Sequence, residues 1–394
     1  MPASPRTARA INDRLALQLL QDEGPLTAGR LKELTGLSRP TVADLVERLT
    51  AAGLIEVAGE AGEQRRGPNA KLYGLVADRA QLAALDVRTE GVAVRVSDLV
   101  GRVLAEASVP IAGDIGTGPA VEQAVTLVER TVKEAGVDRL HTVGIGAPGL
   151  IDPAGGELRN SIGLPEWHRR LVAALQERFP HARVSVENET NLAALAEQRE
   201  GAARDRDTFV LLWLGHGTGA AVVLDGTLRR GASGGTGEIG FLPVPGTDAL
   251  PSAADCEGGF HSLAGSAAIT ALAARHGLTA GPEGEEPPGA AVVREALERG
   301  DAMGPASFLD ALADRVAIGA ASVVAVLDPG CVVLGGEIGQ AGGPELAGRV
   351  AERLRRMTPL PTEVRPGLLG GTAVLRGALL TARESAQEEL FGTP

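Results

Sequence analysis

The first 54 residues alternate amphipathic segments with turn-forming residues. Ile11, Leu15 and Leu19 recur every four residues, which predicts the apolar face of a first helix. Gly24-Pro25 is a dipeptide that interrupts helices, so we expect the first helix to end there.

Two more helices are predicted on either side of a glycine. Thr27 is placed to cap the second helix and Gly36 to end it. Ser38 is placed to cap the third helix, and Pro40 is tolerated in its first turn. The aliphatic residues of the third segment share one face: Val42, Leu45, Val46 and Leu49. A helix, a tight turn and a second helix are what a helix-turn-helix requires.

Two short apolar segments around a polar loop follow, Leu54–Val57 and Ala70–Leu75, and they predict a β-wing. The start of an exposed helix and a cationic wing can face base edges and phosphates. The residues that we expect to contact DNA are Ser38, Arg39, Thr41 and Arg48 on the third helix, and Arg65 and Arg66 in the wing. The alternative is a small helical bundle that serves packing alone.

From Leu82 onward the pattern changes to strands, and then to alternating strands and helices. Strands are predicted over 82–87, 92–96, 103–109, 143–147, 183–186, 209–214, 220–224 and 331–334, and helices over 121–132 and 189–200. This order indicates an α/β unit of about 300 residues. Such a unit is large for one core, which favours two lobes. Gly277–Ala290 is expected to be a surface loop.

Charge separates the two parts of the chain. The 394 residues carry a formal net charge of −12, yet residues 1–80 contain 11 Lys/Arg and 10 Asp/Glu. The acidic remainder should repel nucleic acid, so a DNA-binding role belongs to the first part. Apolar residues make up 44% and aromatic residues 2% of the chain, which predicts a globular protein with aliphatic cores.

Cys256 and Cys331 are the two cysteines, which excludes a disulfide scaffold. No apolar run approaches the roughly 18 residues that span a bilayer. Asn12, Asp13 and Arg14 interrupt the apolar stretch that a secretory signal needs. We therefore expect a cytoplasmic protein without a membrane segment.

Glycine-rich motifs in the second part carry a family resemblance. The ordered set is Gly144-Ile-Gly-Ala-Pro-Gly149, Asn160 with Trp167, Glu187-Asn188, Gly215–Gly240 and Leu334-Gly-Gly336. With a winged helix-turn-helix in front of it, this set resembles the ROK family (repressors, open reading frames and sugar kinases).

The resemblance implies a mainly α winged helix-turn-helix domain over residues 1–80. It implies a two-lobed α/β domain with an actin-like ATPase (ribonuclease H-like) fold over residues 81–394. The lobes would be roughly 81–195 plus the C-terminal helix, and 196–378. Members with this organisation are transcriptional regulators that bind a double-stranded operator, sense a sugar and form a homodimer or homotetramer.

Two departures from the family's kinases bear on catalysis. The kinases hold phosphate with Asp-x-Gly-x-Thr, but Asp86-Val-Arg-Thr89 puts Arg88 at the glycine position, where backbone should approach the phosphate. The kinase base is an Asp after Glu-Asn, and here that residue is Glu189, one methylene longer. We expect no enzyme activity and no cofactor. The alternative is a sugar kinase for ATP-dependent hexose phosphorylation, fused to a DNA-binding domain.

The family's zinc site also lacks its residues. Phe241 stands where the family has His, and only Cys256 and His261 remain of the region that supplies cysteines. A structural zinc ion needs four nitrogen or sulfur ligands, so we expect no metal. Ser262 takes the place of the Glu that ends the cysteine motif and contacts sugar.

A polar set survives from the implied sugar site: Asn160, Asn188, Glu189 and Glu238. Amides and carboxylates suit hydroxyl groups, which both donate and accept, although each residue alone is equally compatible with a turn or cap. Trp167 is compatible with packing on a sugar or in the core. The sequence predicts a sugar-sensing repressor; a regulator whose sensor binds nothing small is a third possibility.

Overall fold

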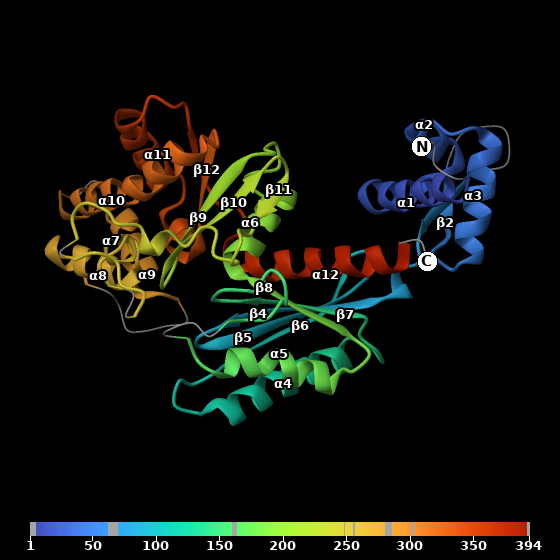
Figure 1. The fold of residues 1–394 in the computed structure, drawn as a ribbon, viewed down its shortest axis with the longest axis horizontal. Coiled ribbons are helices and arrows are strands. Elements are labelled where there is room, and N and C mark those ends of the chain that lie inside the picture. The colour runs from blue at the N-terminus through green and yellow to red at the C-terminus, as the bar shows by residue number, and fades with distance from the viewer. Residues whose placement is uncertain are drawn as a thin grey trace.

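The computed structural model describes residues 5–61, 70–159, 164–247, 249–254, 257–279, 286–300 and 303–391. Three sheets organise this part of the chain, a three-stranded one followed by two of five strands each. In Figure 1 the N-terminal part lies at one end of the molecule, and the two larger sheets form separate lobes. The last helix, α12 (Ala373–Phe391), runs along the first large sheet toward the N-terminal part.

The N-terminal part is a winged helix-turn-helix. Its elements are α1 (Pro5–Glu23), β1 (Leu26–Thr27), α2 (Ala28–Thr35), α3 (Arg39–Ala51), β2 (Ile55–Ala61) and β3 (Ala70–Leu75), with strand order β1-β3-β2. The Thr27 side chain accepts a hydrogen bond from the backbone N–H of Arg30, and Gly36 ends α2 with a φ of 69°. These contacts confirm both predicted caps. Residues of this kind occur at helix ends because the backbone groups there need hydrogen-bond partners or a left-handed conformation.

The predicted apolar face of α1 is wrong for Ile11 and Leu15, although Leu19 packs against the domain core. Ile11 is 58% exposed and Leu15 is 37% exposed, whereas Ala16, Leu17 and Leu20 are buried in the domain core. The segment contains two apolar stripes about a quarter-turn apart. The stripe that includes Ala16 and Leu20 packs against the other helices, whereas the stripe that includes Ile11 and Leu15 faces solvent.

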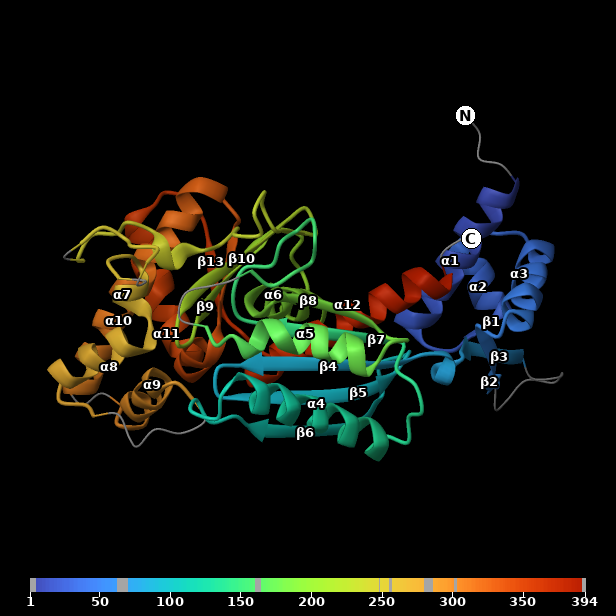
Figure 2. The same cartoon turned by 60° about the horizontal axis from the view of Figure 1, so that its bottom comes forward.

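The first lobe contains a mixed sheet with strand order β6-β5-β4-β7-β8. The 3-10 helix η1 (Ala77–Arg79) leads into it, and its strands are β4 (Gln81–Arg88), β5 (Gly91–Asp98), β6 (Val103–Pro110), β7 (Thr142–Ala147) and β8 (Arg183–Asn188). Figure 2 shows α4 (Thr117–Glu134) and α5 (Trp167–Arg178) on one face of this sheet. The helix α12 covers the opposite face, so both faces of the sheet are buried.

The second lobe is built around the sheet β11-β10-β9-β12-β13. Its strands are β9 (Phe209–Leu214), β10 (Thr218–Leu224), β11 (Thr227–Arg229), β12 (Cys331–Gly335) and β13 (Glu363–Pro366). Its helices are α6 (Glu189–Glu200), α7 (His261–Ala264), α8 (Ser266–Arg275), α9 (Pro288–Glu298), α10 (Met303–Leu327) and α11 (Gly336–Met357), with the 3-10 helices η2 (Ile239–Phe241) and η3 (Gly370–Thr372). The expected loop over Gly277–Ala290 is too long, because α9 already begins at Pro288; residues 280–285 lie outside the described residues.

Alternation along β9 divides the second lobe into two layers. Val210, Leu212 and Leu214 belong to the core shared with α8, α9, α10 and α11. Phe209 and Leu211 point to the other face, where they pack with α6. Successive side chains of a strand point to opposite faces, so one fully apolar strand serves both layers.

The two large sheets share one topology. In each of them the first strand is antiparallel to the second and parallel to the fourth, and the strand order is third, second, first, fourth, fifth. The second and third strands are antiparallel, and the fourth and fifth are parallel, in both sheets. This duplicated arrangement is the ribonuclease H-like fold that the sequence predicts, and α6 lies where the two copies meet.

Candidate DNA interface and effector site

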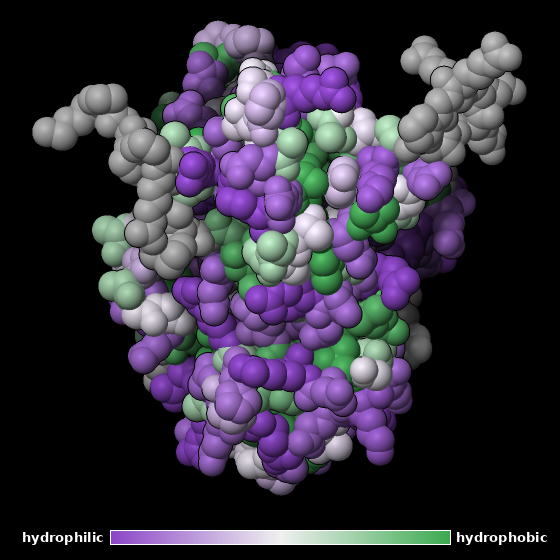
Figure 3. Space-filling view, turned by 90° about the vertical axis from the view of Figure 1, so that its right-hand side faces the viewer, coloured by the Kyte–Doolittle hydropathy of each residue, from purple (hydrophilic) through white to green (hydrophobic). Residues whose placement is uncertain are grey.

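The first turn of α3 presents polar groups to solvent. The Ser38 hydroxyl oxygen accepts a hydrogen bond from the Thr41 backbone N–H at 3.3 Å and lies 2.8 Å from the Thr41 hydroxyl. Arg39 is exposed, and its guanidinium has no ion-pair or hydrogen-bond partner among the described residues. An exposed cation at the N-terminus of this helix can reach a guanine edge or a phosphate. Seen from this end, the surface is mostly hydrophilic with scattered hydrophobic residues (Figure 3).

Arg48, the other cation predicted on α3, is engaged inside the domain. Its guanidinium donates to Asp13 of α1 at 2.6 Å and also pairs with Asp44. These contacts tie α3 to α1, and two carboxylates compensate the charge that was expected to meet DNA. Its contact with DNA stays a prediction. Arg65 and Arg66 lie outside the described residues.

An arginine joins the two lobes. Arg88 ends β4 of the first lobe and contacts Asp86 of the same strand, with nitrogen–oxygen distances of 3.0 Å from Nε and 2.9 Å from Nη2. Its Nη1 donates to Glu337 at the start of α11, in the second lobe, at 2.9 Å. The side chain of Asp86 is 3% exposed and that of Glu337 is 12% exposed. Arg88 therefore provides the positive charge between two buried carboxylates.

Glu189 begins α6 beside this ion pair. Burial and the neighbouring carboxylates of Asp86 and Glu337 together raise the pKa of its carboxyl to about 8, although Arg88 acts in the opposite direction. Among the described residues its side chain has no hydrogen-bond partner. The group is consequently protonated at pH 7 and can donate a hydrogen bond.

Glu238 of the second lobe lies close enough to Glu189 to interact with it electrostatically. Its charge is one of the groups that raise the pKa of Glu189, and partial burial raises the pKa of Glu238 itself. The preceding Gly237 has a φ of 89°, and a Cβ there would lie 1.8 Å from the carbonyl oxygen of Ala220. Only glycine fits this approach, so the glycine-rich segment places Glu238 beside β10. The structure thus brings together two of the four predicted sugar-binding residues.

Asn188 caps α6. Its side-chain oxygen accepts hydrogen bonds from the backbone N–H groups of Thr190 at 2.8 Å and Asn191 at 3.3 Å. Its amide nitrogen donates to the carbonyl oxygen of Gly149 at 3.0 Å. One amide hydrogen is left for a ligand, so Asn188 is first of all a structural residue. Asn160 lies outside the described residues.

Trp167 and His168 begin α5, and His168 bonds to the Arg88 backbone. Trp167 is 5% exposed within the core of the first lobe, which favours the packing alternative for this residue. Its ring meets the His168 ring in a T-shaped contact at 4.3 Å between centroids. The Nε2 of His168 donates to the carbonyl oxygen of Arg88 at 3.3 Å, and burial lowers the pKa of this imidazole to about 4.

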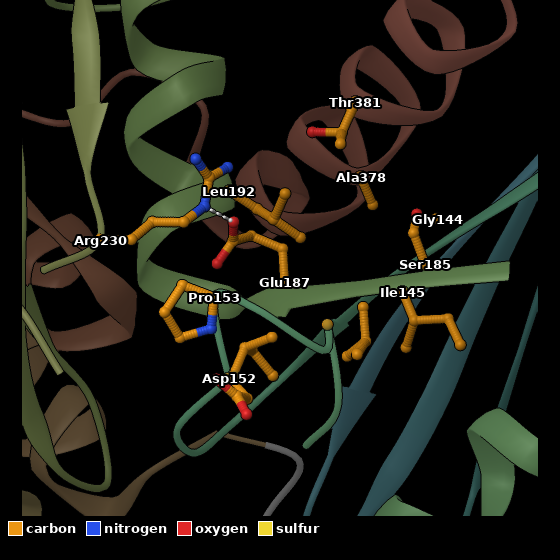
Figure 4. Close-up of a pocket in the computed structure, with 13 residues that line it drawn as sticks. Gly144, Ile145, Asp152, Pro153, Ser185, Glu187, Leu192, Arg230, Ala378 and Thr381 are labelled. Atoms are coloured by element: carbon orange, nitrogen blue, oxygen red, sulfur yellow. Dashed lines mark hydrogen bonds and ion pairs between the residues drawn. The ribbon is translucent and has the colours of Figure 1, made fainter. Parts of the chain in front are cut away.

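A cavity of about 230 Å³ lies on the other side of the α6 N-terminus. Figure 4 shows it between β7, β8, α12 and the segment containing Asp152 and Pro153. Arg230, which follows β11 of the second lobe, reaches into its wall and donates to Glu187 of β8 at 2.6 Å. Neither Glu189 nor Glu238 is among the residues that line this cavity.

The residues of the family's zinc motif serve other roles. The Ser262 hydroxyl accepts a hydrogen bond from the Gly258 N–H at 3.0 Å, and Phe241 belongs to η2. Within the described ranges no three His, Cys, Asp or Glu side chains are grouped to hold a metal ion. Cys331 is buried in β12, where burial raises its thiol pKa to about 11. Cys256 lies outside the described residues.

Sequence reasoning missed Glu337, Glu187 and Arg230. Glu337 directly follows the Leu334-Gly-Gly336 motif, and Glu187 precedes Asn188, so both lie within motifs that the sequence singled out. Position alone did not indicate a role for them, because their partners are 249 and 43 residues away along the chain.

A winged-helix domain in front of a duplicated ribonuclease H-like domain combines a DNA-binding module with a sugar-kinase-like one. The ROK family model matches residues 83–385, and the MarR family model matches residues 11–67. The chain belongs to the ROK family.

Similar proteins include repressors and kinases. A xylose repressor of Caldicellulosiruptor bescii is 24% identical over 336 residues, which is 83% of either chain. The DNA-binding transcriptional dual regulator NagC of Escherichia coli K12 is 26% identical over 244 residues, 60% of this chain and 58% of NagC. A crystal structure of a ROK family transcriptional regulator, a homolog of the E. coli MLC protein, covers 98% of both chains with a TM-score of 0.76 and 21% identity. A ROK hexokinase of Thermus thermophilus covers 78% of this chain and 99% of its own, with a TM-score of 0.62 and 30% identity.

These comparisons confirm the predicted family, the fold and the class of DNA-binding transcriptional regulator. In the part of the chain that the structure describes, no helix has the length and apolar character needed to cross a membrane.

Proposed function

We propose that this protein is a transcriptional repressor that binds an operator through α3 and the wing and releases it in response to a sugar. The observation that carries the proposal is Arg88. Its side chain stands at the strand end where the family's kinases hold phosphate, and it is fixed there by Asp86 and Glu337. The sugar-kinase-like domain is therefore better suited to sensing than to phosphoryl transfer.

The state of Glu189 supports the same conclusion. A general base must be ionised at the working pH to accept a proton from a sugar hydroxyl. Burial holds the pKa of Glu189 at about 8, so this carboxyl is protonated at pH 7. A protonated Glu189 is a hydrogen-bond donor, and Glu238 is an acceptor once it is ionised. Together they can accept a hydrogen bond from one sugar hydroxyl and donate a hydrogen bond to another.

On the DNA side, Arg39 and Thr41 are the residues that we propose read base edges, with Ser38 holding the helix start. A free guanidinium can form a bidentate pair with guanine. Arg65 and Arg66 are proposed to contact the minor groove from the wing, and Arg48 remains a candidate for the adjacent phosphate. The operator is double-stranded, and a homodimer or homotetramer in the cytoplasm would present two or more such helices.

The helix α12 offers a route between the two sites. It follows η3, in which the Gly371 carbonyl oxygen accepts a hydrogen bond from Arg88 Nη2 at 3.4 Å. At its other end, the Gln387 side chain donates to Gln21 of α1 at 2.9 Å, and Phe391 packs against the core of the winged domain. A change in lobe opening would therefore reach α1 through a single helix, and a ligand that prefers one opening would shift DNA affinity.

A thermal-shift screen tests the sensing half of the proposal. Xylose and N-acetylglucosamine come first, because relatives are named as repressors for them, followed by other monosaccharides, sugar phosphates and oligosaccharides. A ligand at 100 times its dissociation constant stabilises by about 2.7 kcal/mol, which a melting curve resolves. The stabilisation should vanish in Glu238→Ala and persist in Glu298→Ala, which removes an exposed carboxylate from α9. A sugar that stabilises both variants equally would place the site elsewhere.

A further inference from the structure

Two ion pairs join the lobes. In one of them the arginine belongs to the first lobe, and in the other it belongs to the second lobe. Arg88 extends from β4 of the first lobe to Glu337 of the second at 2.9 Å. Arg230 extends from the end of β11 in the second lobe to Glu187 of the first at 2.6 Å (Figure 4). The start of α6 lies between them, since Glu187 precedes it by two residues and Glu189 titrates under the influence of Arg88.

Glu187 accepts hydrogen bonds in addition to its contact with arginine, and the carboxylates of Glu187 and Glu337 are both largely screened from water. Glu187 Oε1 accepts hydrogen bonds from the Asn188 N–H and from the Asn191 side-chain amide, both at 2.9 Å. Its Oε2 is thereby directed at Arg230. The side chains of Glu187 and Glu337 are 11% and 12% exposed, so each would be a poorly solvated lone charge without its arginine.

A third contact marks how closely the lobes approach at this point. Gly234 of the second lobe has a φ of 80°, and a Cβ there would lie 1.9 Å from the carbonyl oxygen of Ile151 in the first lobe. The backbones are therefore in direct contact four residues from Arg230. Ion pairs that bridge the lobes beside such a contact would oppose rotation of one lobe against the other.

We propose that Arg88–Glu337 and Arg230–Glu187 form an interlobe clasp that sets the opening between the lobes in the absence of any ligand. In this chain Arg88 connects the lobes at the position where a bound phosphate would otherwise lie. A molecule that changes the opening must stretch or break at least one of these pairs. The inference concerns the unliganded protein and does not depend on the sugar or the operator.

Distance measurements between spin labels on the two lobes test the clasp. Arg169 on α5 and Val326 on α10 are exposed, and Val326 is 81% exposed, so both can be replaced by labelled cysteines. Cys256→Ser removes one native cysteine, and Cys331 is buried. The full-length chain carrying R169C, V326C and C256S, without ligand or DNA, is the reference.

Glu337→Gln keeps the shape of the side chain and removes the charge that Arg88 bridges. We expect a shifted or broadened interlobe distance distribution in Glu337→Gln and at least as large a change in Arg88→Gln, which also loses the contact with the Gly371 carbonyl oxygen. Adding Glu337→Gln to Arg88→Gln should change nothing further, because the ion pair is already absent. Arg230→Gln, on a half-exposed side chain, should broaden the distribution independently and add to the effect of Glu337→Gln. Circular dichroism melting curves establish that each variant is folded.

The matched control is Glu129→Gln. Glu129 pairs with Arg178 at 2.5 Å between α4 and α5, so this substitution removes an ion pair within one lobe. The control should leave the distribution unchanged. Unchanged distributions in folded Glu337→Gln and Arg230→Gln, or equal broadening in Glu129→Gln, would overturn the clasp. Neither result would bear on sugar sensing, which is tested separately by ligand-induced stabilisation.

Discussion

Replacing Glu189 by Gln should stabilise the protein, and by an amount that grows with pH. The carboxyl of Glu189 has a pKa of about 8 in the folded protein, against 4.5 for an unperturbed glutamate. The folded state therefore binds more protons than the unfolded state between these values, and stability falls as the pH rises through the interval. Gln resembles the protonated side chain and does not titrate, so the variant escapes this loss.

The size of the effect follows from the two pKa values. Each pH unit between 4.5 and 8 costs the wild type up to about 1.4 kcal/mol, because the unfolded chain gains a charge that the folded chain resists. At pH 7 the variant should be more stable by roughly 3 kcal/mol, and near pH 4.5 the two proteins should be equally stable. At about 2–4 °C per kcal/mol, the melting temperature should differ by roughly 6–12 °C at pH 7.

Melting curves of both proteins at intervals from pH 4.5 to 8.5 measure this difference directly. Titrating groups that do not interact with Glu189 contribute equally to both curves and cancel. Glu298→Gln, on the exposed surface of α9, is the control and should follow the wild type throughout. If Glu189→Gln also follows the wild type, then Glu189 is ionised in the folded protein, and the argument that it cannot serve as a base fails.

Three further outcomes follow from the site. His168 should contribute a loss of roughly 3 kcal/mol to the wild type as the pH falls from 6.5 to 4, because the folded state resists protonation of this imidazole whereas the unfolded chain accepts the proton. Glu189 changes stability in the opposite direction over this range, so denaturant titrations compare the wild type with His168→Gln at each pH; the stability of the variant relative to the wild type should rise toward pH 4, and a pH-independent difference would show that His168 is not the titrating group. Asn188→Ala should lower the free energy of unfolding by about 0.5–2 kcal/mol and Asn188→Asp by less, since Asp keeps the cap of α6; equal losses in both variants would argue against a capping role. Arg39→Ala should weaken specific operator binding by ~1–3 kcal/mol in a gel-shift titration, whereas Arg79→Ala, an exposed cation on η1, should not; parallel losses would indicate a nonspecific charge effect.

Local sequence signals predicted the elements of this fold well. Thr27, Gly36 and Ser38 were assigned from residue type alone, because a cap is satisfied by groups two or three residues away. The apolar face of α1 was predicted correctly only at Leu19, since a helix with two apolar stripes is oriented by its tertiary contacts. Ala16 and Leu17 decide that orientation only once α2 and α3 are in place.

The candidate site shows the same division. Glu189 and Glu238 were identified by motif, and they do lie near each other. The partner of Arg88 was not foreseen, because Glu337 is 249 residues away and meets it only when both lobes have formed. Asn188 was expected to contact sugar, yet its position before the first residue of α6 already suited a cap, and capping now occupies most of its hydrogen-bonding groups.

Operator affinity measured with and without a stabilising sugar tests the central claim most directly. A labelled operator is first selected from random duplexes by the full-length protein, and binding is then followed by fluorescence anisotropy at one fixed salt concentration. We predict that the sugar that raises the melting temperature also weakens operator binding, and that Glu238→Ala binds the operator normally but no longer responds. Operator affinity that is indifferent to that sugar, together with release of ADP when the sugar and ATP are supplied, would instead identify the protein as a sugar kinase.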